Sequence, residues 1–124
     1  MLTNKLNLFL DMDGVIIDSL PAACTVYNIL YQHHPNFKPA VWYKCTRWDM
    51  KDIAPLYNNI NELFSHKLFF ELVQFMNPNT KDIIEQLCQQ YNVHVVTIGC
   101  PTNLAYKALW LQNNLPCIKN YILT

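Results

Sequence analysis

A short apolar segment that leads into two carboxylates limits the folds open to this chain more than any other feature. Residues 6–10 are almost wholly apolar, and Asp11-Met12-Asp13-Gly14 follows directly. Such a run predicts a strand buried on both faces, as in parallel sheets. Gly14 is one of only two glycines, which indicates a tight loop where the backbone resists a side chain. The segment therefore predicts two acidic side chains at the carboxyl end of a parallel strand.

The C-terminal part of the chain predicts two further strands that alternate with helices. Residues 93–98 and 121–123 are short apolar runs, and residues 80–91 and 104–111 carry apolar side chains at helical spacing. Thr80 is the predicted N-cap of the first of these helices. Strands that alternate with helices favour an α/β fold with a parallel sheet of about three strands.

Between the two regular parts, the chain predicts a small helical insert. Ser19 is a plausible N-cap for a helix that continues to Leu30, and residues 49–56 and 61–66 show short helical patterns. No alternating strand pattern is present in this region. The predicted domains are an α/β core of residues 1–18 and 79–124 and a helical cap of residues 19–78.

Charge and cysteine content exclude several classes of protein. Nine basic and nine acidic residues cancel, so no global field favours a nucleic acid polymer or an anionic membrane. No apolar run approaches the roughly 20 residues that span a bilayer. The five cysteines are odd in number and widely spaced, without a CxxC pair, and no secretory segment is evident. These features predict reduced thiols and a cytoplasmic location.

Polar side chains are predicted to meet at the carboxyl ends of the first two strands, where open parallel sheets bind ligands. Asp11 and Asp13 follow the first strand, and Thr97 ends the second. Two carboxylates so close favour a cation between them, and Mg²⁺ also neutralises phosphate oxygens. Asp11 could then attack phosphorus, and Asp13 could act as the general acid and base. Gly14 would allow the backbone to turn beneath the phosphate, and the Thr97 hydroxyl could donate a hydrogen bond to a phosphate oxygen. A purely conformational turn is the competing interpretation.

Three residues after the second strand are weaker candidates. Gly99 could present backbone N–H groups to a phosphate. Lys107 could be a phosphate partner, but its position within a helix favours a side chain in solvent. Cys100 could be a nucleophile, although no histidine lies close to it in sequence and Asp11 is the better candidate.

Aromatic residues of the insert admit two interpretations. They could form the hydrophobic core of a small helical unit, or they could stack on a nucleobase. Trp42 and Tyr43 are the favoured base contacts because Pro39 places them near a break in the chain. The set comprises Trp42, Tyr43, Trp48, Phe69 and Phe70.

The segment from Leu8 to Asp18 resembles the first motif of the haloacid dehalogenase (HAD) superfamily of phosphohydrolases. Residues 48–53, 68–72 and 120–124 are similar to stretches of its pyrimidine 5'(3')-deoxyribonucleotidase branch, a group of 5'-nucleotidases, and occur in the same order. The resemblance implies a Rossmann-like core with a helical cap. It also implies magnesium-dependent hydrolysis of a (deoxy)nucleoside monophosphate.

Carried over by position, the resemblance implies roles for three residues. Asp11 is the nucleophile, and Asp13 is the general acid and base. The Asp11 side chain and the Asp13 backbone carbonyl bind Mg²⁺. Thr97 takes the place of the threonine of the second motif.

The sequence departs from the family's pattern in two places. Ile98 stands where a second hydroxyl is expected, and the family's lysine and acidic metal-binding motif would follow Thr124, where the sequence stops. The chain is therefore expected to be a C-terminally truncated form with reduced turnover. The alternative is a catalytically impaired nucleotide- or phosphate-binding or interaction module on the same scaffold, or a remnant that binds nothing.

The stop at Thr124 also affects the expected sheet. In the superfamily, the missing fourth strand pairs beside the first, so the strand Leu6–Leu10 is expected to have an open edge. A homo-oligomer could cover this edge.

Overall fold

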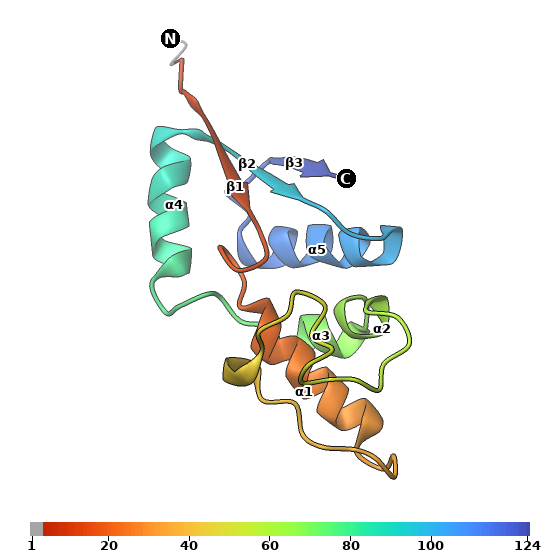
Figure 1. Cartoon of the computed structure of the whole chain (residues 1–124). Helices are drawn as coiled ribbons and strands as arrows, with labels where there is room; N and C mark the ends of the chain where they lie inside the picture. The colour runs from red at the N-terminus through yellow and green to blue at the C-terminus, as the bar shows by residue number, and fades with distance from the viewer. Residues whose placement is uncertain (1–3) are drawn as a thin grey trace.

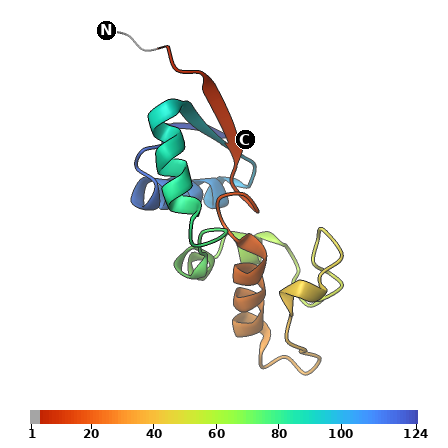
Figure 2. The same ribbon diagram turned by 90° about the vertical axis from the view of Figure 1, so that its left-hand side faces the viewer.

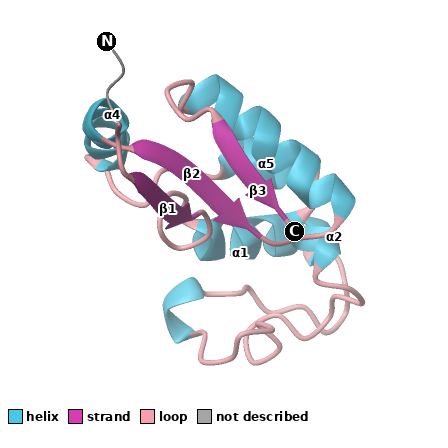
Figure 3. Ribbon diagram, turned by 90° about the horizontal axis from the view of Figure 1, so that it is seen from above, coloured by secondary structure: helices cyan, strands magenta, loops and turns pink. Residues whose placement is uncertain are grey.

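The computed structural model describes residues 4–124, which form an α/β fold around a three-stranded parallel sheet (Figure 1). The strands are β1 (Asn7–Asp11), β2 (Asn92–Thr97) and β3 (Asn120–Leu123), in the order β1-β2-β3. Figure 3 shows the three strands side by side, viewed from above. The predicted fold class and all three predicted strands are confirmed, each within two residues at its ends.

The strand register brings the candidate site residues to one edge of the sheet. Asp11, the last residue of β1, pairs with Val96 of β2, next to Thr97. Thr97 in turn pairs with Leu123 of β3. Both polar side chains therefore lie at the carboxyl ends of neighbouring parallel strands, where ligands of such sheets bind.

Five helices and one short 3₁₀ helix complete the described part of the chain. Figure 1 shows α5 beneath the strands and α1, α2 and α3 farther below, and Figure 2 shows the same lower layer from the side. Among the described residues, no helix has the length and apolar character needed to cross a membrane. The helices are α1 (Ser19–Tyr31), η1 (Trp42–Lys44), α2 (Asn61–Phe64), α3 (Lys67–Leu72), α4 (Thr80–Gln90) and α5 (Pro101–Asn114).

The predicted N-caps of two helices are wrong by one residue. Ser19 is the first residue of α1, and Asp18 occupies the cap position. Thr80 is likewise the first residue of α4, after Asn79. The Ser19 hydroxyl does not cap the helix because it donates a hydrogen bond to Asp13. It therefore belongs to the candidate site described below.

The core of the molecule lies on one face of the sheet. Val93 and Val95 of β2 are buried there, together with Leu111 of α5 and Ile84 of α4. The opposite face is open, so the prediction that the first strand is buried on both faces is wrong. Phe9 of β1 is 56% exposed and stacks on the His94 ring at 4.8 Å. Among the described residues, no helix packs over this face, which we call the open face.

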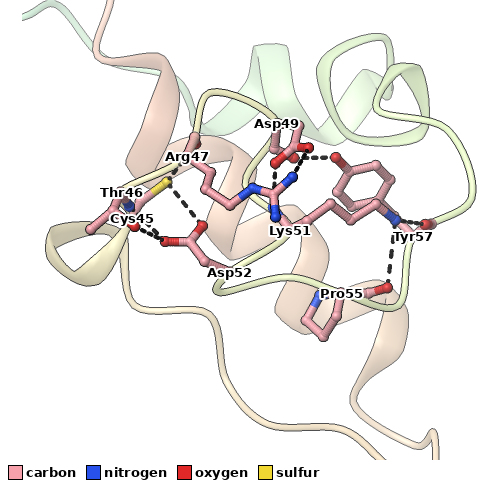
Figure 4. Close-up of polar contacts among 8 residues, drawn as sticks. All are labelled: Cys45, Thr46, Arg47, Asp49, Lys51, Asp52, Pro55 and Tyr57. Carbon is pink, nitrogen blue, oxygen red and sulfur yellow. Dashed lines mark hydrogen bonds and ion pairs between the residues drawn. The ribbon is translucent and has the colours of Figure 1, made fainter.

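The insert is less helical than predicted between η1 and α2. Residues 49–56 form turns, not a helix. Side chains bind the backbone there: Asp52 accepts from the Thr46 N–H at 2.6 Å, and Lys51 donates to the Tyr57 carbonyl at 2.6 Å (Figure 4). Such local bonds compete with helix formation. The predicted helical pattern at 61–66 is confirmed in part, as α2.

A compact apolar centre holds the insert together. Tyr27 of α1, Leu63 of α2 and Phe69 of α3 are fully buried. For Phe69, the interpretation as a core residue is confirmed. The predicted division into a core of residues 1–18 and 79–124 and an insert of residues 19–78 stays a prediction.

Two linkers that run side by side connect the insert to the core. Ile17 forms an antiparallel bridge with Phe75. The Asp18 N–H donates to the Gln74 carbonyl at 2.9 Å, and the Met76 N–H donates to the Ile16 carbonyl at 2.8 Å. The chain therefore leaves the core and returns to it at the same place.

Candidate active site

A tight loop directly after β1 holds Asp11 and Asp13. The N–H groups of Ile16 and Ile17 both donate to the Met12 carbonyl, at 2.9 and 3.1 Å. Gly14 has a φ of +74°, a conformation that costs other residues roughly 1–2 kcal/mol. The prediction of a glycine-dependent turn at this position is confirmed.

The two carboxylates of the loop have different surroundings. Asp11 is exposed, and its Oδ1 accepts a hydrogen bond from the Met12 N–H at 2.7 Å. Both oxygens of Asp13 accept side-chain hydrogen bonds, from Ser19 Oγ at 2.6 Å and from Lys107 Nζ at 2.7 Å. Asp11 therefore keeps an open carboxylate oxygen, whereas Asp13 is held in a fixed position.

Lys107 lies at the centre of the site, and the prediction that its side chain lies in solvent is wrong. The residue is only 1% exposed. Besides Asp13, its ammonium donates to Thr97 Oγ1 at 2.8 Å and to the Ile98 carbonyl at 3.1 Å. Three oxygens thus satisfy all three ammonium protons, which is what a buried lysine requires. The cation sits beneath the edge where β1 and β2 end.

Thr97 is the buried end of β2 and faces the same point. Its hydroxyl accepts from Lys107, so its own proton remains available to a further oxygen. No acceptor takes that proton within residues 4–124. The structure thus brings together four of the predicted site residues: Asp11, Asp13, Thr97 and Lys107.

Gly99 is required by packing against Asn103 of α5. A Cβ at position 99 would lie 2.1 Å from Asn103 Oδ1. Asn103 is buried, and its side-chain amide donates to the Phe64 carbonyl of α2 at 2.7 Å. The prediction that this position resists a side chain is confirmed. Its contact with phosphate stays a prediction, and sequence reasoning missed Asn103 altogether.

Gly99→Ala is expected to destabilise the fold by about 1–3 kcal/mol, because the methyl group would displace Asn103 and leave the Phe64 carbonyl unpaired. Urea unfolding measures this change in the free energy of unfolding. In an Asn103→Ala background, the same glycine substitution should cost less than about 0.5 kcal/mol, since the clashing group is gone. Equal costs in both backgrounds would contradict the packing argument.

Cys100 contacts the insert and not the acidic loop. Its Sγ lies 3.0 Å from Ser65 Oγ, and this hydrogen bond holds the pKa of the Cys100 thiol below its ordinary value. Burial has the opposite effect at Cys24, where it raises the thiol pKa to about 11. All five thiols are free. The predicted roles of Asp11 and Cys100 as nucleophiles both stay predictions.

Trp42 and Tyr43 lie in η1, beside α1 and apart from the acidic loop in both Figures 1 and 2. Their rings pack edge to face at 5.7 Å, and they are 51% and 70% exposed. The core interpretation is therefore wrong for these two aromatics. Their predicted contact with a base stays a prediction.

Oxygen atoms at the acidic loop fit a magnesium ion. Mg²⁺ prefers oxygen ligands and is usually held by one or two carboxylates, with waters and phosphate oxygens in the other positions. The exposed Asp11 carboxylate and the Asp13 backbone carbonyl could supply two ligands without disturbing the Asp13–Lys107 pair. Within the described part of the chain, no cluster of three or more acidic, histidine or cysteine side chains forms a complete metal cage.

Comparison with known proteins identifies the fold. No protein-family model matches the chain, and no curated protein does. Solved structures do match. YfnB from Bacillus subtilis, assigned as a HAD hydrolase and bound to magnesium, aligns over 98% of this chain with a TM-score of 0.64 and 17% identity. The chain has the HAD fold.

Two further HAD-fold structures agree with this assignment. A protein from Thermotoga maritima, assigned as a β-phosphoglucomutase, covers 95% of the chain with a TM-score of 0.58 and 13% identity. A protein from Lactobacillus plantarum, assigned as a phosphoglycolate phosphatase, covers 98% with a TM-score of 0.55 and 17% identity. The chain spans between 61% and 66% of the length of these three proteins.

Proposed function

We propose that this chain is a magnesium-dependent phosphohydrolase that acts on phosphate monoesters through an aspartyl-phosphate at Asp11. The observation that carries the proposal is the contact of buried Lys107 with both Asp13 and Thr97, at 2.7 and 2.8 Å. This contact gathers a cation, a hydroxyl and one carboxylate at the carboxyl edge of a parallel sheet, in the loop that also carries Asp11. The shared fold with proteins assigned as HAD hydrolases supports the same reaction class.

In the proposed reaction, the open carboxylate oxygen of Asp11 forms a bond to phosphorus while the bond from phosphorus to the ester oxygen breaks. Asp13 gives a proton to the leaving oxygen and later takes one from the water that hydrolyses the aspartyl-phosphate. Thr97 donates its unpaired hydroxyl proton to a phosphate oxygen, and the Lys107 cation, which holds Thr97 and Asp13 in place, offsets the phosphate charge. The Asp11 side chain and the Asp13 carbonyl would hold a magnesium ion, which would supply positive charge that offsets the phosphate charge.

We propose a (deoxy)nucleoside monophosphate as the substrate. The resemblance of three segments to the pyrimidine deoxyribonucleotidase branch supports this, as do the exposed rings of Trp42 and Tyr43, which could stack on a base if the insert approached the core. A cytoplasmic location is also a proposal, supported by the five free thiols.

The proposal is tested by phosphate release from a panel of deoxynucleoside monophosphates, sugar phosphates and phosphoglycolate. We expect magnesium-dependent release that is greatest with the nucleotides and is lost on chelation. Release that is greatest with sugar phosphates would contradict the substrate class but support the reaction. No release above the buffer with any ester would contradict the reaction itself.

One observation favours a second function, a module that binds phosphate or nucleotide without turnover. Both Asp13 oxygens are already engaged by Ser19 and Lys107, so Asp13 must exchange these bonds before it can transfer a proton. Magnesium-dependent binding of a nucleotide, measured by calorimetry, without phosphate release would favour this function over hydrolysis.

A further inference from the structure

The end of α2 contacts the start of α5 through two side-chain hydrogen bonds (Figure 1). The buried Asn103 amide donates to the Phe64 carbonyl at 2.7 Å, and Cys100 Sγ lies 3.0 Å from Ser65 Oγ. Phe64 is the last residue of α2, and the last carbonyls of a helix have no partner within the helix. Asn103 therefore gives α2 a hydrogen-bond partner that the helix itself cannot provide.

The same carboxamide also packs on Gly99, two residues after Thr97. A Cβ at position 99 would lie 2.1 Å from Asn103 Oδ1 and 2.9 Å from its Cγ, so the carboxamide fills the space that a side chain would need. Protein interiors are close-packed, and a group in such contact cannot move without displacing its neighbour. A rotation of the Asn103 side chain is therefore expected to move the backbone at Gly99.

Asn103 and Lys107 link the end of β2 to two different parts of the chain. They stand one turn apart on α5, on the same face of the helix. Lys107 donates to the Thr97 hydroxyl at 2.8 Å and to Asp13 of the acidic loop at 2.7 Å. Asn103 lies against the next turn of backbone and donates to Phe64 of the insert. One side chain thus connects the end of β2 to the acidic loop, and the other connects it to the insert.

We propose that Asn103 is a positioning residue that couples the place of α2 to the conformation of the segment Thr97–Cys100. When α2 moves, the Phe64 carbonyl moves with it, and the Asn103 amide either follows or loses its acceptor. Loss of the acceptor is costly for a buried donor, so the side chain turns with α2. The turn presses the carboxamide against Gly99 or withdraws it, and the backbone after Thr97 shifts accordingly.

The packing of the insert sets the position of the acceptor. The Phe64 ring lies 5.3 Å from the ring of Phe69, which is fully buried in the insert. A helix as short as α2 has little stability of its own, so packing of this kind holds its last carbonyl in place. A change in the insert is therefore expected to reach Gly99 through Phe64 and Asn103.

The coupling has a consequence for hydrolysis that rests on the proposed function. Thr97 is the proposed hydroxyl donor to the phosphate, and the segment that follows it would change its aim. Asn103→Ala is therefore expected to lower magnesium-dependent phosphate release about tenfold, because a small misplacement of a contact group slows a reaction. The insert would influence the reaction through this hydrogen bond as well as through any contact with the substrate.

The two glycines of the chain allow a direct test by NMR. Labelling only glycine with ¹⁵N gives two amide signals, one from Gly14 in the acidic loop and one from Gly99. Phe64→Leu alters the packing of α2 and is expected to shift the Gly99 signal, with the Gly14 signal unchanged. In an Asn103→Ala background, the same substitution should leave the Gly99 signal in place, because the connecting side chain is gone.

Phe37→Leu is the matched control, because the Phe37 ring belongs to the same insert but stacks on Tyr27 of α1, at 6.1 Å. It should not shift the Gly99 signal. A Gly99 shift of equal size with and without Asn103 would come from the lost ring itself and would overturn the proposal. The absence of any Gly99 shift in Phe64→Leu would overturn it as well.

The Gly14 signal also reports whether each variant is folded. If Asn103→Ala unfolds, Asn103→Asp takes its place as the background, since it keeps the size of the side chain and an ionised carboxylate cannot donate. The signals are recorded without substrate and therefore decide the coupling independently of turnover. A chain that shows the coupling but releases no phosphate would contradict the proposed function alone.

Discussion

Asp11→Asn is expected to lower phosphate release by a factor on the order of 10³ or more, because the amide cannot form the aspartyl-phosphate. The substitution keeps the size of the side chain, and the amide oxygen can still accept from the Met12 N–H, as Oδ1 does at 2.7 Å. The loop should therefore keep its shape. Phosphate release measured with magnesium reports the loss, and mass spectrometry of the acid-quenched wild type should find a phosphoryl group on the peptide with Asp11.

Asp82→Asn is the matched control for this experiment. Asp82 is an exposed residue in the first turn of α4 and takes no part in the hydrogen bonds among Asp13, Thr97 and Lys107, so the same atom exchange there should leave phosphate release unchanged. Equal release by wild type and Asp11→Asn would mean that Asp11 is not the nucleophile. A phosphoryl group found on another residue would lead to the same conclusion and would identify the residue to test next.

Lys107→Met is expected to affect both stability and activity. The methionine keeps the apolar stem but removes three hydrogen bonds, to Asp13, Thr97 and the Ile98 carbonyl. Loss of one member of a buried ion pair is costly, but Asp13 is 38% exposed and can be solvated, so we expect about 1–3 kcal/mol. The Tm should then fall by roughly 5–10 °C. Phosphate release should fall by a factor on the order of 10²–10³.

The control for this substitution is Lys81→Met on α4, which makes the same change on an exposed side chain. Thermal unfolding and phosphate release of Lys81→Met should both match the wild type. If Lys107→Met also matched the wild type in Tm, its side chain would lie in solvent, as the sequence alone predicts. A lower Tm with unchanged release would mean that Lys107 supports the fold but does not contribute to phosphate release.

The strands and the acidic loop can be predicted because their signals are local. An apolar run that ends at Asp11 and a glycine at a positive φ are both determined by neighbouring residues. The prediction for Lys107 is wrong because it rests on the general rule that charged side chains are rarely buried. The helical spacing of α5 nevertheless indicates that Lys107 is buried. Lys107 stands four residues before buried Leu111 and three after Leu104, on the face of α5 that turns toward the sheet.

Other features depend on contacts between distant residues, which no local pattern reveals. The hydrogen bond from Asn103 to Phe64 joins helices 39 positions apart, and the ion pair of Lys107 with Asp13 spans 94 positions. The turns at 49–56 replace a predicted helix because Asp52 and Lys51 bind backbone groups instead. The acidic loop, by contrast, predicts phosphate chemistry from neighbouring residues alone.

The paired linkers at Ile17 and Phe75 allow the insert to change without a change in the acidic loop. Because the chain leaves and re-enters the core at one point, the length of the segment between the linkers scarcely affects the geometry of the sheet, and its closure entropy rises only slowly with length. Evolution can therefore lengthen, shorten or exchange the insert while Asp11 and Asp13 stay in place. For protein engineering, the same point is a natural junction at which a different insert could be grafted onto an unchanged sheet and acidic loop.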